Sequence, residues 1–180
     1  MTPMGESVFT ADCLAGKTAL ITGGSSGIGA AAAVALDRAG ADVVICARRR
    51  DRLSEVAASL SKTAITIEID LSAPRAGERL AAQAIEQLGR PVDILVNAAG
   101  FGELCRTARL SEDRVDAVFS VNVRAALMLA SRLVPHMAGR SGCSIINVSS
   151  VTGRMGTPFQ AAYAATKGAL DAVTRSLARE

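Results

Sequence analysis

Tyr163 and Lys167 are the residues whose types and spacing most directly suggest chemistry. Tyr163 is the only tyrosine of the 180-residue chain, and Lys167 follows it by four positions. On a helix this spacing places both side chains on one face, about 6 Å apart along the axis. An ammonium about 4 Å from the phenol would stabilise the phenolate by up to about 4 kcal/mol. The pair can therefore exchange protons with a substrate; an amphipathic tyrosine beside an exposed lysine is the ordinary alternative.

A glycine-rich segment lies between a predicted strand and a predicted helix near the start of the chain. Residues 19–29 read ALITGGSSGIG, and glycines at such a turn let backbone N–H groups approach a ligand. The following helix would add its unpaired N–H groups and the positive end of its dipole, so a pyrophosphate can be held without a lysine. No GK[ST] sequence closes the loop, which disfavours a P-loop ATPase. A structural glycine turn is the alternative.

Seven residues of this segment are expected to bind a dinucleotide: Thr22, Gly23, Ser25, Ser26, Gly27, Ile28 and Gly29. Of these, Thr22 is expected to stabilise the loop rather than to contact the ligand directly.

The second predicted strand ends in a basic pair, Arg48 and Arg49. In dinucleotide folds this position, roughly 20 residues beyond the glycines, holds an acid that reads the NAD ribose or an arginine that reads the NADP phosphate. No carboxylate occurs here before Asp51, and arginine binds phosphate bidentately. The pair therefore predicts NADP(H) in preference to NAD(H), with a solvated charge run as the alternative. Asp70, followed by Leu71, can accept from the adenine amino group or cap a helix.

Short apolar runs alternate with longer segments of helical periodicity. The runs are rich in Val and Ile, as in parallel strands covered on both faces, and span residues 18–22, 42–47, 64–69, 93–97 and 144–148. The helical segments span residues 27–39, 51–60, 74–88, 112–137 and 158 onward. Strand–helix–strand repetition implies right-handed crossovers, so we expect an α/β fold with a doubly wound, Rossmann-like parallel sheet in three α/β/α layers.

The last predicted helix opens with a capping signal. Thr157 suits the N-cap, Pro158 the first helical position, and Gln160 can return a hydrogen bond as in a capping box. The helix carries a small apolar face, which core packing and a subunit interface explain equally well. That face consists of Ala165, Ala169, Ala172 and Val173.

Composition bounds the remaining function classes. The chain carries 20 Lys and Arg against 17 Asp and Glu, a formal charge of +3, and the scattered basic residues do not predict nucleic-acid binding. A hydrophobic content of 49% excludes intrinsic disorder. The cysteines form no CxxC pair and His136, read as a surface residue, is the only histidine, so we expect reduced thiols and no metal site. The cysteines are Cys13, Cys46, Cys105 and Cys143.

The length fits one domain, residues 1–180, with a short N-terminal lead over residues 1–15. No apolar run approaches the roughly 20 residues of a membrane span, and residues 1–12 lack the pattern of a signal peptide. We therefore expect no membrane association and a cytoplasmic protein.

Five motifs, taken together and in this order, resemble the short-chain dehydrogenase/reductase family. They are TGGSSGIG at Thr22–Gly29, NAAG at Asn97–Gly100, Asn122 within VNV, the serine of NVSSVTG at 147–153, and YAATK at Tyr163–Lys167. They extend over nearly the whole chain, and their combination is specific although each alone is weak.

The resemblance implies roles for individual residues. Tyr163 would be the general acid/base, and Lys167 would activate it and hold the nicotinamide ribose. Ser150, rather than Ser149, matches the family spacing to the tyrosine and would orient the substrate oxygen. Asn122 would bind a water that links Lys167 to solvent, or would bond backbone within its helix.

The resemblance also implies a cofactor cleft and a reaction. Asn97, Ala98, Ala99 and Gly100 would line the cleft, with Asn97 equally suited to a structural brace. The implied reaction is reversible hydride transfer between NADP(H) and a small-molecule carbonyl or alcohol. Members of the family assemble helix to helix, so a homo-oligomer, a dimer or a tetramer, is expected.

The chain departs from the family after the helix that carries Tyr163. It supplies strands only up to the fifth of the order 3-2-1-4-5-6, so we expect a sheet that lacks the last strands and the substrate lid. Ile145, Ile146 and Val148 would then form an apolar edge. Two hypotheses follow: an NADP(H)-dependent oxidoreductase, or a nucleotide-binding or oligomerising remnant that keeps the catalytic residues without turnover.

Overall fold

A computed structural model describes residues 12–180. The predicted lead over residues 1–15 and the reading of residues 1–12 against a signal peptide fall almost wholly on residues 1–11, which lie outside the described residues. At the centre is a parallel sheet in the order β3-β2-β1-β4-β5. Its strands are β1 (Thr18–Thr22), β2 (Asp42–Ala47), β3 (Ile65–Glu68), β4 (Ile94–Asn97) and β5 (Ser144–Asn147).

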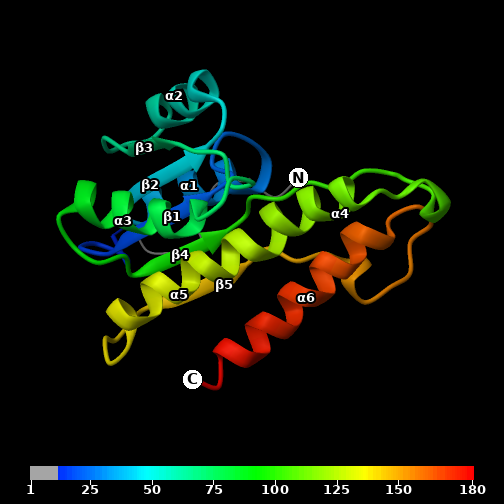
Figure 1. The fold of residues 1–180 in the computed structure, drawn as a ribbon. Helices are drawn as coiled ribbons and strands as arrows, with labels where there is room; N and C mark the ends of the chain where they lie inside the picture. Colours follow the sequence, from blue (N-terminus) through cyan, green and yellow to red (C-terminus); the bar gives the residue numbers. More distant parts are fainter. Residues whose placement is uncertain (1–11) are drawn as a thin grey trace, which may run out of the picture.

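Helices cover both faces of the sheet (Figure 1). They are α1 (Gly27–Arg38), α2 (Arg50–Ala58), α3 (Ala76–Leu88), α4 (Glu112–Phe119), α5 (Ala126–Met137) and α6 (Ala161–Leu177), with short helices η1 (Thr107–Arg109), η2 (Ser120–Ala125) and η3 (Val151–Gly153). Alternate strand residues point to opposite faces, so Ile21 packs toward α1 and α2 while Leu20 packs toward α3 and α5. The predicted doubly wound α/β fold is confirmed.

The helix predicted over residues 112–137 is continuous but irregular. Residues Ser120–Ala125 adopt a π-helix between α4 and α5, and π-bulges often occur at functional sites. By length and hydropathy Glu112–Met137 is apolar enough to cross a membrane, so the expectation that no such run exists is wrong on this criterion. Leu129, Leu133 and Met137 are buried in the cluster shared with α3 and the sheet. That packing makes the α5 part of this stretch a component of the core.

The expected start of the last helix is wrong. Helix α6 begins at Ala161, and Gln160 at its N-cap makes no side-chain capping bond. Phe159 has a positive φ of 65°, which interrupts the helical path after Pro158. The Phe159 carbonyl instead accepts a hydrogen bond of 2.7 Å from the Cys105 N–H. Contact with the loop after β4 therefore overrides the local capping signal.

The expectation that every strand is covered on both faces is wrong for β3 and β5. Ile146 pairs in register with Val96 and so points to the face covered by α1 and α2. Those helices lie over β1, β2 and β3, and Ile146 is 47% exposed. On β3, Thr66 and Glu68 are exposed at the opposite edge of the sheet.

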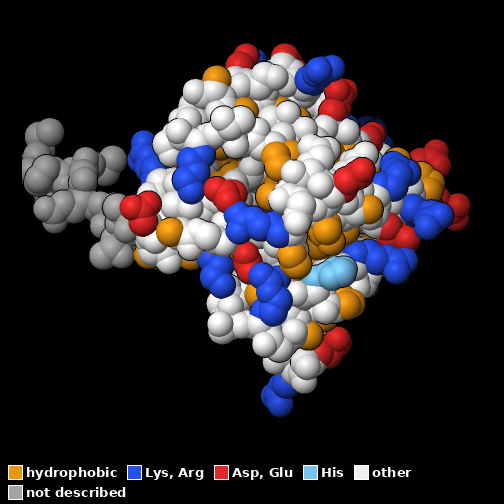
Figure 2. Space-filling model, turned by 90° about the vertical axis from the view of Figure 1, so that its left-hand side faces the viewer, with side chains coloured by type: hydrophobic (Ala, Val, Ile, Leu, Met, Phe, Trp, Pro, Cys, Tyr) orange, Lys and Arg blue, Asp and Glu red, His pale blue; other side chains and the backbone are white. Residues whose placement is uncertain are grey.

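The surface carries interspersed charges rather than one basic patch on the face drawn in Figure 2. His136 is exposed, as predicted. On the small apolar face of α6, Ala165 and Ala172 are exposed and Ala169 and Val173 are half-buried. Core packing within the described residues therefore does not account for that face.

Candidate active site

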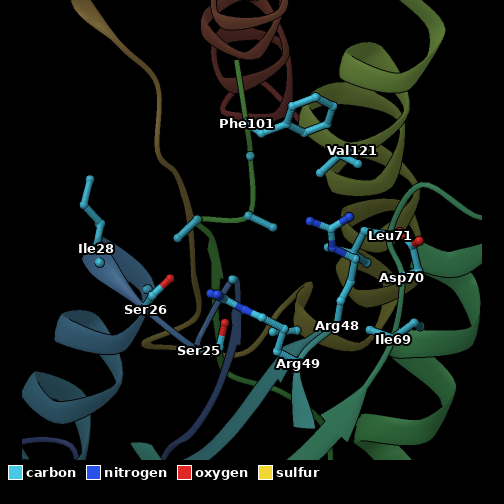
Figure 3. Close-up of a pocket in the computed structure, with 17 residues that line it drawn as sticks. Ser25, Ser26, Ile28, Arg48, Arg49, Ile69, Asp70, Leu71, Phe101 and Val121 are labelled. Carbon is cyan, nitrogen blue, oxygen red and sulfur yellow. The ribbon is translucent and has the colours of Figure 1, made fainter. Parts of the chain in front are cut away.

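A cavity of about 370 Å³ lies at the carboxyl ends of the parallel strands. The loops after β1, β2, β3 and β4 all reach this edge because parallel strands end on the same side of a sheet. Thirteen of the residues predicted to contact a cofactor line the cavity (Figure 3): Gly23, Ser25, Ser26, Gly27, Ile28, Gly29, Arg48, Arg49, Asp70, Leu71, Ala98, Ala99 and Gly100.

The glycine loop is shaped by close backbone contacts. A β-carbon on Gly23 would lie 2.9 Å from the Ala99 Cα, and one on Gly29 would collide with the Gly23 carbonyl oxygen. Glycine at both positions lets the start of α1 fold back over the end of β1. Ser26, the N-cap residue of α1, makes no side-chain capping bond, so N–H groups of the first turn are free of a side-chain cap at the cavity wall.

The two arginines after β2 point into the cavity from the same side (Figure 3). The Arg49 side chain extends toward Ser25 and Ser26, and the Arg48 side chain lies beside Leu71 and Asp70. Hydrogen bonds from the Ser72 N–H and hydroxyl, at 2.9 and 2.7 Å, hold the pKa of Asp70 below its usual range, with a smaller contribution from Arg48. The Asp70 carboxylate therefore organises its own turn, while Arg48 and Arg49 form no ion pair among the described residues.

Thr22, Asn97 and Lys167 are predicted at the cofactor but do not line the cavity. The Thr22 hydroxyl oxygen accepts from the N–H groups of Ala98 and Ala99, at 3.1 and 3.0 Å. The Asn97 amide donates to the Asn147 side chain at 2.9 Å, while its buried Oδ1 has no partner. Thr22 and Asn97 thus connect the ends of neighbouring strands. These contacts fit the structural roles given for them above, a loop stabiliser for Thr22 and a brace for Asn97.

The structure brings Tyr163 and Lys167 together on one face of α6. The Lys167 Nζ lies 5.6 Å from the centroid of the tyrosine ring and donates to the Val148 carbonyl at 2.7 Å. Lys167 is 5% exposed, and burial lowers the pKa of its ammonium, while the Asp171 carboxylate opposes that shift. A β-carbon on Gly100 would lie 3.5 Å from the Lys167 Nζ, so the ammonium adjoins the cavity wall.

Asn122 lies inward on the π-helix, 1% exposed. Its Oδ1 accepts from the Phe101 N–H at 3.0 Å, and its Nδ2 donates to the Phe101 carbonyl at 2.9 Å and to the Thr166 hydroxyl at 3.0 Å. It therefore bonds backbone across the site, not within its own helix. A β-carbon on Gly100 would lie 3.2 Å from the Asn122 Oδ1 as well as 3.5 Å from the Lys167 Nζ.

Ser150 follows β5, and its hydroxyl oxygen accepts from the Thr152 N–H at 3.2 Å and from the Thr152 hydroxyl at 2.9 Å. The turn it begins packs on α6: a β-carbon on Gly153 would lie 2.9 Å from the Lys167 carbonyl carbon. Ser149 instead donates to the Lys167 carbonyl at 3.2 Å. The two serines thus make different contacts beside the same residue of α6.

Comparison with known proteins identifies the family. The family model described as short chain dehydrogenase matches residues 17–180. The chain belongs to the short-chain dehydrogenase family.

Relatives within the short-chain dehydrogenase family are longer than this chain. A short chain dehydrogenase of Pseudocercospora fijiensis is 42% identical over 174 residues, which cover 93% of this chain and 55% of the relative. A putative short-chain alcohol dehydrogenase of Sinorhizobium meliloti superposes with a TM-score of 0.86 at 37% identity, covering 92% of this chain and 67% of that one. A metagenomic short-chain oxidoreductase solved in complex with NADP gives a TM-score of 0.86 at 34% identity, covering 92% and 76%.

Four residues that line the cavity are not predicted from the sequence: Ala47, Ile69, Phe101 and Val121. Ala47 and Ile69 directly precede predicted residues, and Phe101 and Val121 directly flank the NAAG motif and Asn122. Adjacency to a recognised motif was therefore the available signal.

Proposed function

We propose that this chain is the NADP(H)-binding and proton-transferring part of an oxidoreductase that interconverts a carbonyl and an alcohol. The supporting observation is that one residue of the cavity wall lies beside the proposed proton-transfer pair. Gly100 lines the cavity, and its backbone lies beside the Lys167 ammonium that accompanies Tyr163. A dinucleotide held by the glycine loop would thus end near the acid–base pair.

The residues present suit a phosphorylated dinucleotide. The cradle around Gly23 and Gly29 excludes side chains and offers backbone N–H groups at the start of α1, which suits a pyrophosphate. Arg48 and Arg49 enter the same cavity and form no ion pair among the described residues. Two such guanidinium groups favour the additional phosphate of NADP(H) over the bare ribose of NAD(H). The NADP complex of the metagenomic relative is consistent with this preference.

When bound, the nicotinamide supplies or accepts the hydride. In carbonyl reduction the Tyr163 hydroxyl gives its proton to the substrate oxygen, and in alcohol oxidation the phenolate takes that proton back. The Ser150 hydroxyl donates a hydrogen bond to the same oxygen and stabilises its developing charge. Lys167 places a positive charge beside the phenol. Asn122 holds the loop after β4 against α6, and a relay water would bind between its side chain and Lys167.

Turnover by the purified chain tests the proposal. We expect NADPH oxidation in the presence of a panel of small ketones, and a loss of kcat/KM of at least about 100-fold in Tyr163→Phe, because general acid catalysis contributes about that much or more. NADPH binding, followed by its fluorescence, should survive the substitution because Tyr163 does not line the cavity.

Two results would contradict this account. Turnover retained in Tyr163→Phe would remove the tyrosine from the reaction. NADPH binding without turnover on any ketone by the unsubstituted chain would favour the remnant hypothesis, in which the residues persist without activity.

We also propose that the chain is cytoplasmic and forms a homo-oligomer through the small apolar face of α6. The exposure of Ala165 and Ala172 supports an interface there, and size-exclusion chromatography of Ala165→Glu beside the unsubstituted chain tests it. A homo-oligomer whose size is unchanged by this charge would place the interface elsewhere.

A further inference from the structure

Gly102 lies directly against the ring of Tyr163. A β-carbon built on Gly102 would lie 2.6 Å from Cδ2 and 2.7 Å from Cγ of the tyrosine, well inside van der Waals contact. Gly102 is not among the glycines with positive φ, so its backbone conformation is open to other residues. The ring, and not the backbone, is what requires glycine at this position.

The segment that carries Gly102 is held on both sides of it, at Phe101 and at Cys105. Before it, the N–H and carbonyl groups of Phe101 are both bound by the buried Asn122 side chain. After it, the Cys105 N–H donates to the Phe159 carbonyl at 2.7 Å, and the Arg106 guanidinium lies over the Phe159 ring, 5.8 Å from its centroid. In Figure 1 the chain after β4 runs beside the segment that leads into α6.

The helix on the other side of the contact is anchored to the same asparagine. The Thr166 hydroxyl donates to the Tyr163 carbonyl at 2.7 Å and accepts from Asn122 Nδ2 at 3.0 Å. Asn122 therefore ties the backbone before Gly102 to the backbone of Tyr163. With both backbones fixed, the ring is the part that would have to move if Gly102 acquired a side chain.

We propose that Gly102 is a positioning residue for the acid–base tyrosine. Its bare Cα forms one wall of the slot that sets the direction of the phenol ring, on the face of α6 that also carries Lys167. A methyl group at this position turns the ring away from its productive orientation without touching the nucleotide cavity, which Gly102 does not line. The inference about the phenol's use rests on the proposed function; the steric contact does not.

A double-mutant cycle tests the contact independently of activity. Gly102→Ala should lower the melting temperature of the chain and of Tyr163→Phe, because both keep an aromatic ring in the slot. In Tyr163→Ala the same substitution should cause a clearly smaller loss, because the ring is gone and only the β-carbon of residue 163, 3.2 Å from the added methyl group, remains. An equal loss in the Tyr163→Ala background would overturn the proposal. If Gly102→Ala does not fold alone, Tyr163→Ala must restore folding, and failure to do so counts against it as well.

Spectroscopy and kinetics test the consequence for the phenol. Tyr163 is the only tyrosine and the chain has no tryptophan, so its near-ultraviolet circular dichroism band reports the orientation of this one ring. Gly102→Ala should change that band and lower kcat about 100-fold, the cost of a misplacement of about 1 Å, while leaving NADPH affinity unchanged.

Gly156→Ala is the matched control. Gly156 also lies in a loop near α6, lacks a positive φ, and has open space where a β-carbon would stand, with no atom within 4 Å. This variant should keep the tyrosine band, the kcat and the melting temperature. An unchanged band in Gly102→Ala, or an equal change in Gly156→Ala, would overturn the positioning role. If the unsubstituted chain shows no turnover, the circular dichroism band and the melting temperatures still test the positioning role of Gly102. A failure of the proposed function is thereby distinguished from a failure of this inference.

Discussion

At the scale of single residues, cofactor preference depends on Arg48. Its side chain enters the cavity beside Leu71 and Asp70, and an arginine that binds a phosphate contributes about 1.5–3 kcal/mol through charge-assisted hydrogen bonds. We therefore expect Arg48→Ala to weaken NADPH binding by about 10- to 100-fold and to change NADH binding little, as measured by fluorescence titration. Arg50, exposed in α2 and absent from the cavity lining, is the matched control. If Arg48→Ala weakened the binding of NADPH and of NADH equally, Arg48 would not recognise the additional phosphate of NADPH.

Most residues of the cavity were within reach of the sequence because parallel strands deliver their following loops to one edge. Residues after β1, β2, β3 and β4 could be named from their motifs alone. Gly102 could not, since its role depends on a contact with Tyr163 across 61 positions of sequence. The placement of Thr22 and Asn97 beneath the cavity likewise depends on side-chain bonds between strand ends, which a periodic pattern does not specify.

At the scale of elements, the sequence located every strand and long helix to within a few residues, and it failed where tertiary contacts decide. Strand β1 and strand β2 have the predicted bounds because buried parallel strands are recognisable as apolar runs. The π-helix at Ser120–Ala125 is not predicted by the helical periodicity, and it directs Asn122 to bonds with Phe101, which lies in a distant loop. The start of α6 moved to Ala161 because Phe159 bonds the loop after β4.

The elements β1 and β4 are joined at their starts by one buried carboxylate, Asp93. Burial alone would raise its pKa, but bonds from the Thr18 N–H and hydroxyl at 2.9 and 3.1 Å, with Arg140 and Lys17 nearby, hold the pKa below its usual range. A lowered folded-state pKa means that this stabilisation is complete above the unfolded value of about 3.9 and is lost as pH falls through the folded value.

We therefore expect the free energy of unfolding, from urea titrations, to fall below about pH 4, and to fall less steeply in Asp93→Asn. At neutral pH this variant should be about 1–3 kcal/mol less stable, the cost of weakening hydrogen bonds to a buried charge. Glu55→Gln, which removes an exposed carboxylate that pairs with Arg52 on α2, should follow the parent curve. If the free energy of unfolding fell equally with pH in the parent and in Asp93→Asn, Asp93 would not be the group whose protonation destabilises the fold.

At the scale of the whole molecule, the open edge of β5 is a second surface, apart from the α6 face, at which we expect copies of this chain to associate. Within residues 12–180 this strand pairs only with β4, and Ile146 presents 47% of its surface beside unpaired backbone groups, a combination that recruits further strands. The net charge of +3 offers little repulsion against such pairing. Ile146→Lys should therefore reduce concentration-dependent light scattering while changing the stability by less than about 0.5 kcal/mol, because the side chain is half exposed. Met155→Lys adds the same charge at an exposed loop residue outside the sheet, so it is the control for net charge. If both substitutions reduced light scattering equally, the effect would come from charge alone and not from the strand edge.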